Sequence, residues 1–245
     1  RETFQAGADG SVEIKLPADY GTRLFYVLRN EGAPKLLSKS ADTLLLDDFE
    51  LGLGFNLAVH GKGFDVVKDT DVQENHVLRI VSGHPSQNVL VTQGLEDMAD
   101  YELSFKFRIP AVPAEAGKGG LLHLGYRDSG SQRFYFGLGY EACKDGKSSW
   151  TVSSPVMVLD GGKNEGYGKT VAASPVEASV DTEWHTLAIK VQGPRHTIAI
   201  DGKTVFEGED ERNLKGPFTI APGWGWNKTE YVEIDEISVK SLKQE

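Results

Sequence analysis

The sequence predicts an all-β protein in which two antiparallel sheets pack face to face as a sandwich. Three observations support this prediction. Many short segments alternate apolar and polar residues with a period of two, glycine-rich turns separate them, and no long segment has the 3.6-residue period of a helix. A succession of strands without strand–helix alternation is typical of a two-sheet sandwich.

The clearest strand is predicted at residues 101–109. Its odd-numbered residues are apolar and its even-numbered residues are polar or charged, so one face points to a core and the other to water. Other segments of similar pattern predict the remaining strands, at 63–68, 76–82, 88–93, 120–127, 132–140, 149–159, 170–180, 184–192, 195–201, 203–207, 217–221 and 230–241.

Residues 183–206 predict two hairpins in a row. Leu187, Ile189 and Val191 point to one side of the first strand, and Asp201-Gly202 provides a tight turn after the second. The pattern W-H-T-L-A-I-K-V … I-A-I-D-G-K-x-V resembles the central hairpins of concanavalin A-like, laminin-G-like jelly rolls. The resemblance extends over residues 43–242 and also includes keto-disaccharide hydrolase domains. It implies a jelly roll at 42–245, a fold that serves lectins, hydrolases and lyases alike.

Residues 1–41 are predicted to be a separate short β appendage with a linker. The segment V-x-I-x-L-P-A-x-Y-G-T-R-L-F-Y-V-L at 12–28 resembles the closing strands of the β-domain that follows a glycosidase barrel. Forty residues are too few to bury a good core alone. The order of these parts resembles galactocerebrosidase-type glycosidases, and it implies a catalytic domain upstream in the same polypeptide.

The composition limits the classes of partner. The chain has 245 residues and a formal net charge of −10 at pH 7. Nucleic acids and anionic membranes are bound by clustered Lys and Arg, so neither is expected as a partner. A neutral, hydroxyl-rich ligand suits this chain better, and we expect a glycan or oligosaccharide.

Three features bear on where the protein works. Cys143 is the single cysteine, which excludes an intrachain disulfide, and a low thiol content suits a bacterial extracytoplasmic protein. No apolar run approaches membrane-spanning length. The chain begins with Arg1 rather than Met, which indicates a cleaved product or a fragment. We therefore expect a secreted, periplasmic or cell-surface protein.

The segment Glu233-Ile234-Asp235-Glu236 resembles the Glu-x-Asp-x-(x)-Glu strand of laminarinase-like hydrolases. The final glutamate is missing and the segment lies on the last strand, so we expect it to be structural. The resemblance to jelly rolls implies another use, because several of those families hold calcium between the first and last strands. Asp48, Glu50 and Asp235 are the candidate ligands, since Ca²⁺ prefers oxygen. The alternative is that these carboxylates are solvated or paired with cations.

Aromatic and arginine side chains outside the core are the candidates for glycan binding, because sugar rings stack on flat side chains. In 132–140, Phe134, Phe136 and Leu138 are predicted to face the core, which leaves room for a ligand beside Gly137 and Gly139 on the other face. The candidate binding residues are Tyr126, Arg127, Arg133, Tyr135 and Tyr140, with His123 beside them, and Trp224 and Trp226 in a glycine-rich loop. Trp184 is predicted to pack inward.

Three functions remain open on this sequence. The first is a non-catalytic carbohydrate-binding module of a secreted multidomain glycoside hydrolase. The second is a jelly-roll hydrolase or lyase, which would need two close carboxylates or a Tyr with Arg and His; Glu141 and Glu165 join Tyr126 and Arg127 as residues to inspect. The third is a structural or protein-binding domain, which would show a flat apolar patch.

Overall fold

The structure is a computed structural model that describes residues 42–54, 56–72, 74–81, 89–112, 117–130, 132–142, 148–153, 155–159, 163–173, 180–212, 215–223 and 231–242. The predicted appendage at 1–41 lies outside these residues. The described part of the chain consists of strands and their connections and contains no helix. It accordingly includes no helix that is long and apolar enough to cross a membrane.

One sheet has nine strands in the described residues. Its path runs β12-β15-β14-β13-β6-β17-β4-β3, and β1 pairs with β17 outside this path. The strands of this sheet are β1 (Thr43–Asp47), β3 (Phe64–Lys68), β4 (His76–Val81), β6 (Tyr101–Arg108), β12 (Lys169–Ala173), β13 (His185–Gln192), β14 (Arg195–Ile200), β15 (Lys203–Glu209) and β17 (Tyr231–Ser241).

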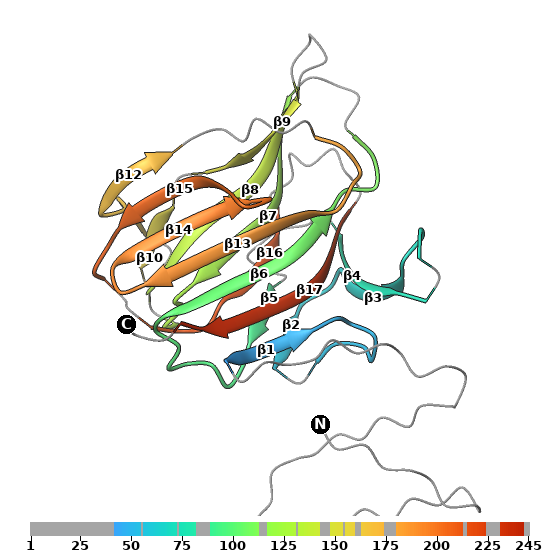
Figure 1. Ribbon diagram of the computed structural model, residues 1–245, viewed down its shortest axis with the longest axis horizontal. Helices are drawn as coiled ribbons and strands as arrows, with labels where there is room; N and C mark the ends of the chain where they lie inside the picture. The colour runs from blue at the N-terminus through green and yellow to red at the C-terminus, as the bar shows by residue number, and fades with distance from the viewer. Residues whose placement is uncertain are drawn as a thin grey trace, which may run out of the picture. The chain divides into compact units, whose positions relative to one another are not determined.

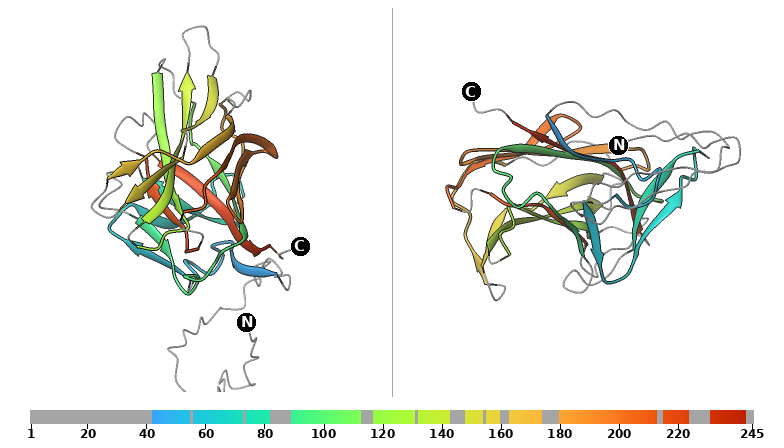
Figure 2. Two further views of the ribbon diagram at one scale, coloured as in Figure 1. Left: turned by 90° about the vertical axis from the view of Figure 1, so that its left-hand side faces the viewer. Right: turned by 90° about the horizontal axis from the view of Figure 1, so that it is seen from below.

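The second sheet has eight strands and runs β11-β10-β8-β7-β16-β5-β2, with β9 paired to β8. Its strands are β2 (Leu57–His60), β5 (Val89–Thr92), β7 (Gly117–Tyr126), β8 (Gln132–Ala142), β9 (Ser148–Val152), β10 (Val156–Leu159), β11 (Asn164–Glu165) and β16 (Thr219–Pro222). All pairings in both sheets are antiparallel, and the sheets form two stacked layers (Figures 1 and 2). The prediction of a two-sheet antiparallel sandwich is confirmed.

The double hairpin β13-β14-β15 forms as its alternation predicts. Leu187, Ile189 and Val191 are fully buried, while their neighbours in β13 are partly or wholly exposed. The turns occur where the backbone tolerates positive φ, at Gly193 (φ 53°) and at Asp201-Gly202 (φ 49° and 75°). The Asp201 carboxylate accepts a hydrogen bond from Thr186 N at 2.8 Å, which ties the second turn to the start of β13.

The core lies between the two sheets. Inward-facing residues of β6, β13, β14 and β17 meet those of β7, β8 and β16, and the largest fully buried side chain is Trp150 of β9. Trp150 packs edge-on against Phe107, with ring centroids 5.3 Å apart. Burial of this many apolar side chains supplies the main favourable term for folding.

β17 occupies a central place in its sheet. It lies between β6 and β4, and its C-terminal half also pairs with β1. A bulge between Asp235 and Ser238 shifts the register with β6, and Glu236 has a positive φ of 51°. The last strand therefore pairs with three strands, β1, β4 and β6, from different parts of the chain.

Two sequence-based expectations about the fold were wrong. Residues 149–159, expected as one strand, form β9 and β10, and both strands pair with β8. Trp184, expected in the core, is half-buried, with the Arg108 guanidinium 4.5 Å from its ring centroid. His185 takes the inward position because it continues the alternation of Leu187 and Ile189.

Candidate functional site

The candidate site lies on the outer face of the eight-stranded sheet, where β8, β7 and β16 run side by side (Figure 1). Phe134, Phe136 and Leu138 point into the core, as predicted, so Arg133 and Tyr135 point outward. On β7 the buried Leu122 and Leu124 place His123 and Gly125 on this outer face, and on β16 Thr219 lies opposite Gly125.

Tyr135 and His123 form the centre of this face. The Tyr135 hydroxyl is in direct contact with His123 Nδ1, and the two rings meet edge to face with centroids 5.1 Å apart. Both side chains are half-buried, so a ligand on the sheet can reach them. A phenol hydrogen-bonded to an imidazole is a pair through which a proton can pass.

The protonation states of this pair follow from burial. Burial lowers the pKa of His123 below its ordinary value, and burial raises the pKa of Tyr135 to about 12, a rise that the positive charge of Arg133 opposes. At neutral pH the imidazole is therefore neutral and the phenol is protonated. A neutral imidazole beside a phenol has one nitrogen available to accept a proton.

Glycine makes room beside the pair. Gly137 lies opposite His123 in the register of β7 and β8, and its nitrogen donates a hydrogen bond to Ser153 Oγ at 2.7 Å. A Cβ at position 137 would lie 3.6 Å from His123 Cδ2 and 3.5 Å from Ser153 Oγ, so it would contact the imidazole without a clash. The missing side chain leaves the edge of the His123 ring open.

Tyr126, Arg127 and Tyr140 do not belong to this face. All three side chains are fully buried, which corrects the expectation that they escape the core. Tyr126 continues the inward row of Leu122 and Leu124, and Tyr140 contributes to the core on β8. Arg127 has a positive φ of 47° where β7 ends, and this bend sends its side chain under the sheet rather than over it.

Arg127 and His196 form a polar cluster inside the protein. Arg127 Nη1 donates to Gly193 O at 2.7 Å and to His196 Nε2 at 3.1 Å, and Tyr126 Oη lies 3.2 Å from His196 Nδ1. Because Nε2 accepts from the guanidinium, the neutral imidazole carries its proton on Nδ1. Burial and the Arg127 charge lower the pKa of His196 to about 3. These groups are buried inside the protein and do not lie on the outer face of the eight-stranded sheet.

The predicted calcium ligands are engaged by protein donors. Glu50 accepts from His76 N at 2.8 Å and lies 3.2 Å from His76 Nδ1, while Asp235 accepts from Asn75 Nδ2 at 3.2 Å. Asp48 is buried at the end of β1, which does pair with β17 as expected. Within the described ranges, no three His, Cys, Asp or Glu side chains are grouped so that they could hold a metal ion. Calcium at Asp48, Glu50 and Asp235 stays a prediction, which a calcium titration after EDTA treatment tests.

Glu233 lies on the outer face of the other sheet. Its carboxylate accepts from Arg79 Nη2 at 2.7 Å and from Arg108 Nε at 2.8 Å, and Arg108 also contacts Asp69 at 2.8 Å. The carboxylate is almost completely buried between the two guanidinium groups. These contacts tie β17 to β4 and β6, and we assign Glu233 a structural role.

Replacing Glu233 by glutamine tests this role. We expect E233Q to reduce the free energy of unfolding by roughly 1–3 kcal/mol, because Arg79 and Arg108 lose a charged partner while Asp69 still pairs with Arg108. Urea unfolding measures the loss. Any activity of the Tyr135 face should persist in the folded variant, and an inactive variant of normal stability would contradict the structural assignment.

The remaining enzyme candidates are also paired. Glu141 contacts Lys118 Nζ at 3.1 Å at the far end of β7 and β8, and Glu165 contacts Arg212 Nη1 at 3.2 Å. Trp224 and Trp226 lie outside the described residues. His123 was one of the candidates named on 120–140, and its outward position on β7, between the buried Leu122 and Leu124, is the signal that singles it out.

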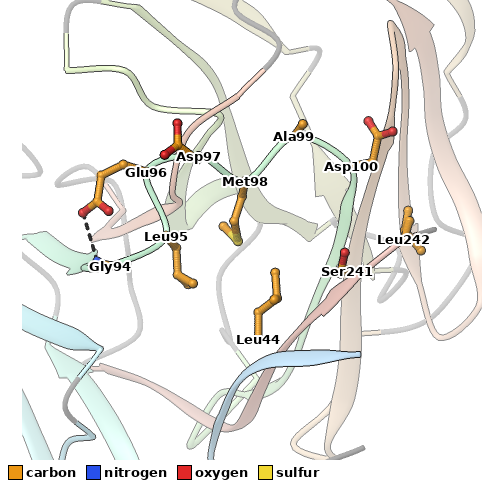
Figure 3. A pocket seen from close by; sticks show the side chains of 10 residues that line it. All are labelled: Leu44, Gly94, Leu95, Glu96, Asp97, Met98, Ala99, Asp100, Ser241 and Leu242. Atoms are coloured by element: carbon orange, nitrogen blue, oxygen red, sulfur yellow. Dashed lines mark hydrogen bonds between the residues drawn. The ribbon is translucent and has the colours of Figure 1, made fainter. Parts of the chain in front are cut away.

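A hollow of about 470 Å³ lies away from this face, beside the connection between β5 and β6. Leu44, Leu95 and Met98 point into it (Figure 3). Glu96 turns back to accept a hydrogen bond from Gly94 N at 2.9 Å, and Asp97 is paired with Lys215 at 2.7 Å. Polar and apolar groups both line the hollow, and its carboxylates Glu96, Asp97 and Asp100 are engaged by protein donors.

The two antiparallel sheets define a concanavalin A-like β-sandwich, and its eight-stranded sheet carries a Tyr–His pair. Residues 54–240 match the 3-keto-alpha-glucoside-1,2-lyase-like domain, and the chain belongs to this family. The resemblance to keto-disaccharide hydrolase domains is thereby confirmed. No curated protein matches the sequence.

Several solved structures are similar to this chain at low sequence identity. A glycoside hydrolase family 16 endo-glucanase from Bacteroides ovatus is 13% identical, with a TM-score of 0.47 over 81% of this chain and 100% of that chain. Alginate lyase Aly36B is 14% identical, with a TM-score of 0.44 over 74% and 88% of the two chains. The carbohydrate binding module CBM66 from Bacillus subtilis is 11% identical, with a TM-score of 0.41 over 76% and 96%.

Proposed function

We propose that this domain eliminates the C1 substituent from a glucoside whose C3 is oxidised to a ketone, with Tyr135 and His123 moving the proton. The family to which the chain belongs supports the substrate class. The single observation that carries the proposal is the contact between Tyr135 Oη and His123 Nδ1 on an open, glycine-lined sheet face. A jelly-roll lyase without two close carboxylates needs a Tyr with Arg and His, and Tyr135, Arg133 and His123 are such a set.

The chemistry needs only proton transfer. A ketone at C3 makes the hydrogen on C2 acidic, because the electrons of the broken C2–H bond move into an enolate. Tyr135 takes this proton while its own phenolic proton passes to His123 Nδ1, so that no free phenolate is needed at neutral pH. The neutral state of His123, which its lowered pKa favours, leaves that nitrogen free to accept.

The second half of the reaction restores the pair. The enolate re-forms the ketone, a double bond forms between C1 and C2, and the C1–O bond breaks with its electron pair on the leaving oxygen. The imidazolium returns one proton through Tyr135 to that oxygen. Atoms and charge balance without an oxidant or reductant, and Tyr135 and His123 end in their starting states.

The second candidate is glycan binding without turnover. The half-buried Tyr135 and the Arg133 side chain, 38% exposed, offer a surface for a sugar on the same face, and no two carboxylates are brought together there within the described strands. In this case the chain would be the binding module of a secreted, multidomain glycoside hydrolase with its catalytic domain upstream. Both candidates place an oligosaccharide on the same face.

Proton exchange separates the two candidates. The purified chain is incubated in D₂O with methyl 3-keto-α-glucoside and, separately, with methyl α-glucoside, and NMR follows the C2 proton and any released methanol. Exchange and release from the ketone alone, above the rate in buffer, support elimination. Saturable binding of glycans without exchange supports the binding module. A chain that neither binds nor exchanges would leave a structural domain.

Filling the gap at Gly137 should impair the site without unfolding the protein. G137A adds a Cβ in ordinary contact with His123 Cδ2 and Ser153 Oγ, and position 137 does not require positive φ. We expect a melting temperature close to that of the wild type and a clear loss of C2 exchange, because the methyl group occupies the space next to the imidazole. G130A, at a turn position with φ of 84°, is the contrasting variant, which should lose stability but retain exchange. Full exchange in G137A would argue against this gap as the substrate position.

A further inference from the structure

We propose that Arg133 stabilises the negative charge that develops on the sugar when the C2 proton leaves, and thereby selects sugars that carry a ketone. This inference rests on the proposed function and assigns a further residue to the same site. Neither the sequence pattern nor the family assignment identifies a group for the enolate oxygen. The structure places one positive charge beside the Tyr–His pair.

The strand geometry brings Arg133 next to Tyr135. The two residues are separated by one position on β8 and share its outer face, so their Cα atoms are roughly 7 Å apart. A Cβ at Gly125 would lie 3.2 Å from Arg133 Cδ, and Gly125 is the residue directly opposite Tyr135 on β7. The stem of Arg133 therefore lies against the neighbouring strand beside the tyrosine, at a position where the side chains of Arg133 and Thr219 fill the space over Gly125.

The turn after β7 orients the guanidinium without satisfying it. Arg133 Nη1 lies 4.0 Å from Asp128 Oδ2, which is longer than a hydrogen bond. Asp128 is itself fixed, because its Oδ1 accepts from Gly130 N at 2.8 Å and its own nitrogen donates to Pro217 O at 3.0 Å. A guanidinium has five N–H donors, so Arg133 retains donors for a ligand oxygen.

The electrostatic surroundings of the pair favour an anion. The positive charge of Arg133 opposes the rise that burial causes in the pKa of Tyr135. Burial lowers the pKa of His123, which keeps the imidazole neutral. An enolate formed over this pair would lie beside the Arg133 guanidinium, and the Asp128 carboxylate lies 4.0 Å from that guanidinium. A donor aimed at charge that appears only during the reaction accelerates the reaction more than it tightens substrate binding.

The test compares R133M and R133K with Y135F and with a remote control. R195M removes an exposed arginine from β14 of the other sheet, where it pairs with Glu207, and should behave like the wild type. We expect R133M to lower kcat for elimination and the rate of C2 exchange by about 100-fold, with a smaller change in KM and an unchanged melting temperature. R133K should recover part of the loss, because an ammonium retains the charge but not the planar fork of donors.

The possible results separate this inference from the proposed function. If R133M exchanges the C2 proton at the wild-type rate while Y135F does not, the role of Arg133 is wrong and the function stands. The role of Arg133 is also wrong if R133M changes only KM, or if a fall in melting temperature explains the lost activity. If the wild-type chain exchanges no C2 proton, the proposed function fails and the role of Arg133 fails with it.

Discussion

Y135F is expected to slow C2-proton exchange on a 3-keto-glucoside by about 10²- to 10⁴-fold, the usual range for loss of a positioned acid–base group. The variant keeps the ring that contacts His123 edge to face and loses only the hydroxyl. NMR exchange rates measured at several substrate concentrations would give the loss in kcat and in kcat/KM. A removed proton-transfer group should appear mainly in kcat.

Matched variants make this result specific. Y231F is the same chemical change at a half-buried tyrosine on β17, whose ring stacks under the Arg79 guanidinium at 4.0 Å, and it should exchange normally. H123Q should show a loss comparable to that of Y135F, and the double variant little more than either, because the two side chains act as one unit. Independent, multiplicative losses would contradict a shared proton path.

The second large effect concerns stability between pH 3.8 and 6, where two buried groups are expected to act in opposite directions. Burial and the Arg127 charge lower the pKa of His196 from 6.5 to about 3. Burial raises the pKa of Asp235 from 3.8 to about 6, against the hydrogen bond from Asn75. In the wild type these two contributions oppose each other over this range, and His123, whose pKa burial also lowers, acts in the same direction as His196.

The sign of each contribution to stability depends on whether the unfolded or the folded chain takes up the proton first as the pH falls. As the pH falls below 6.5, His196 takes up its proton in the unfolded chain before it does so in the folded chain, so the protein loses stability until about pH 3. As the pH falls below 6, Asp235 takes up its proton in the folded chain before it does so in the unfolded chain, so the protein gains stability until about pH 3.8. Each contribution has a slope of at most about 1.4 kcal/mol per pH unit. Asp69, Asp97 and Asp210 have lowered pKa values and act below 3.8.

Urea unfolding at pH 4, 5 and 6 tests this balance. D235N removes the stabilising protonation and should lose stability steadily as the pH falls. H196F keeps the ring contacts with Phe134 and Tyr126 and should gain stability over the same steps. H196Q serves as a second variant if H196F folds poorly, since only the slope with pH matters. Parallel slopes in D235N and H196F would contradict the assignment.

Much of the fold could be predicted because alternation is a local property. Alternation correctly predicted core residues such as Phe105, Phe134 and Leu187 on β6, β8 and β13, whereas Tyr140 on β8 was wrongly expected outside the core. The split between β9 and β10 was missed, because Ser153 to Pro155 is a short interruption in an otherwise strand-like segment. Trp184 was wrongly expected in the core, because the inward row of this strand is formed by His185 and Leu187 and leaves the preceding residue outside that row.

The site was predictable only in part. Alternation correctly placed Arg133 and Tyr135 on the outer face, yet the same rule applied to Leu122 and Leu124 would have put Tyr126 in the core and His123 outside. The contact between Tyr135 and His123 depends on the register of β7 against β8, which the bulge at Leu121 shifts by one residue. The burial of Arg127 could not be predicted from the sequence. Its side chain turns inward because its backbone has a positive φ, and Arg127 is not a glycine, the residue type that usually marks such a position.

The central position of β17 determines when this protein can fold during synthesis. β4, β6 and β1 all precede it in the chain, but β4 and β6 are joined in the sheet only through β17. Until residues 231–241 have left the ribosome, those earlier strands expose unpaired edges and apolar faces, which are prone to aggregate. The nascent chain therefore waits in an incomplete state, and closure of its larger sheet is expected to be a late, long-range step. Shielding by chaperones during that wait should affect yield more than any substitution on the Tyr135 face.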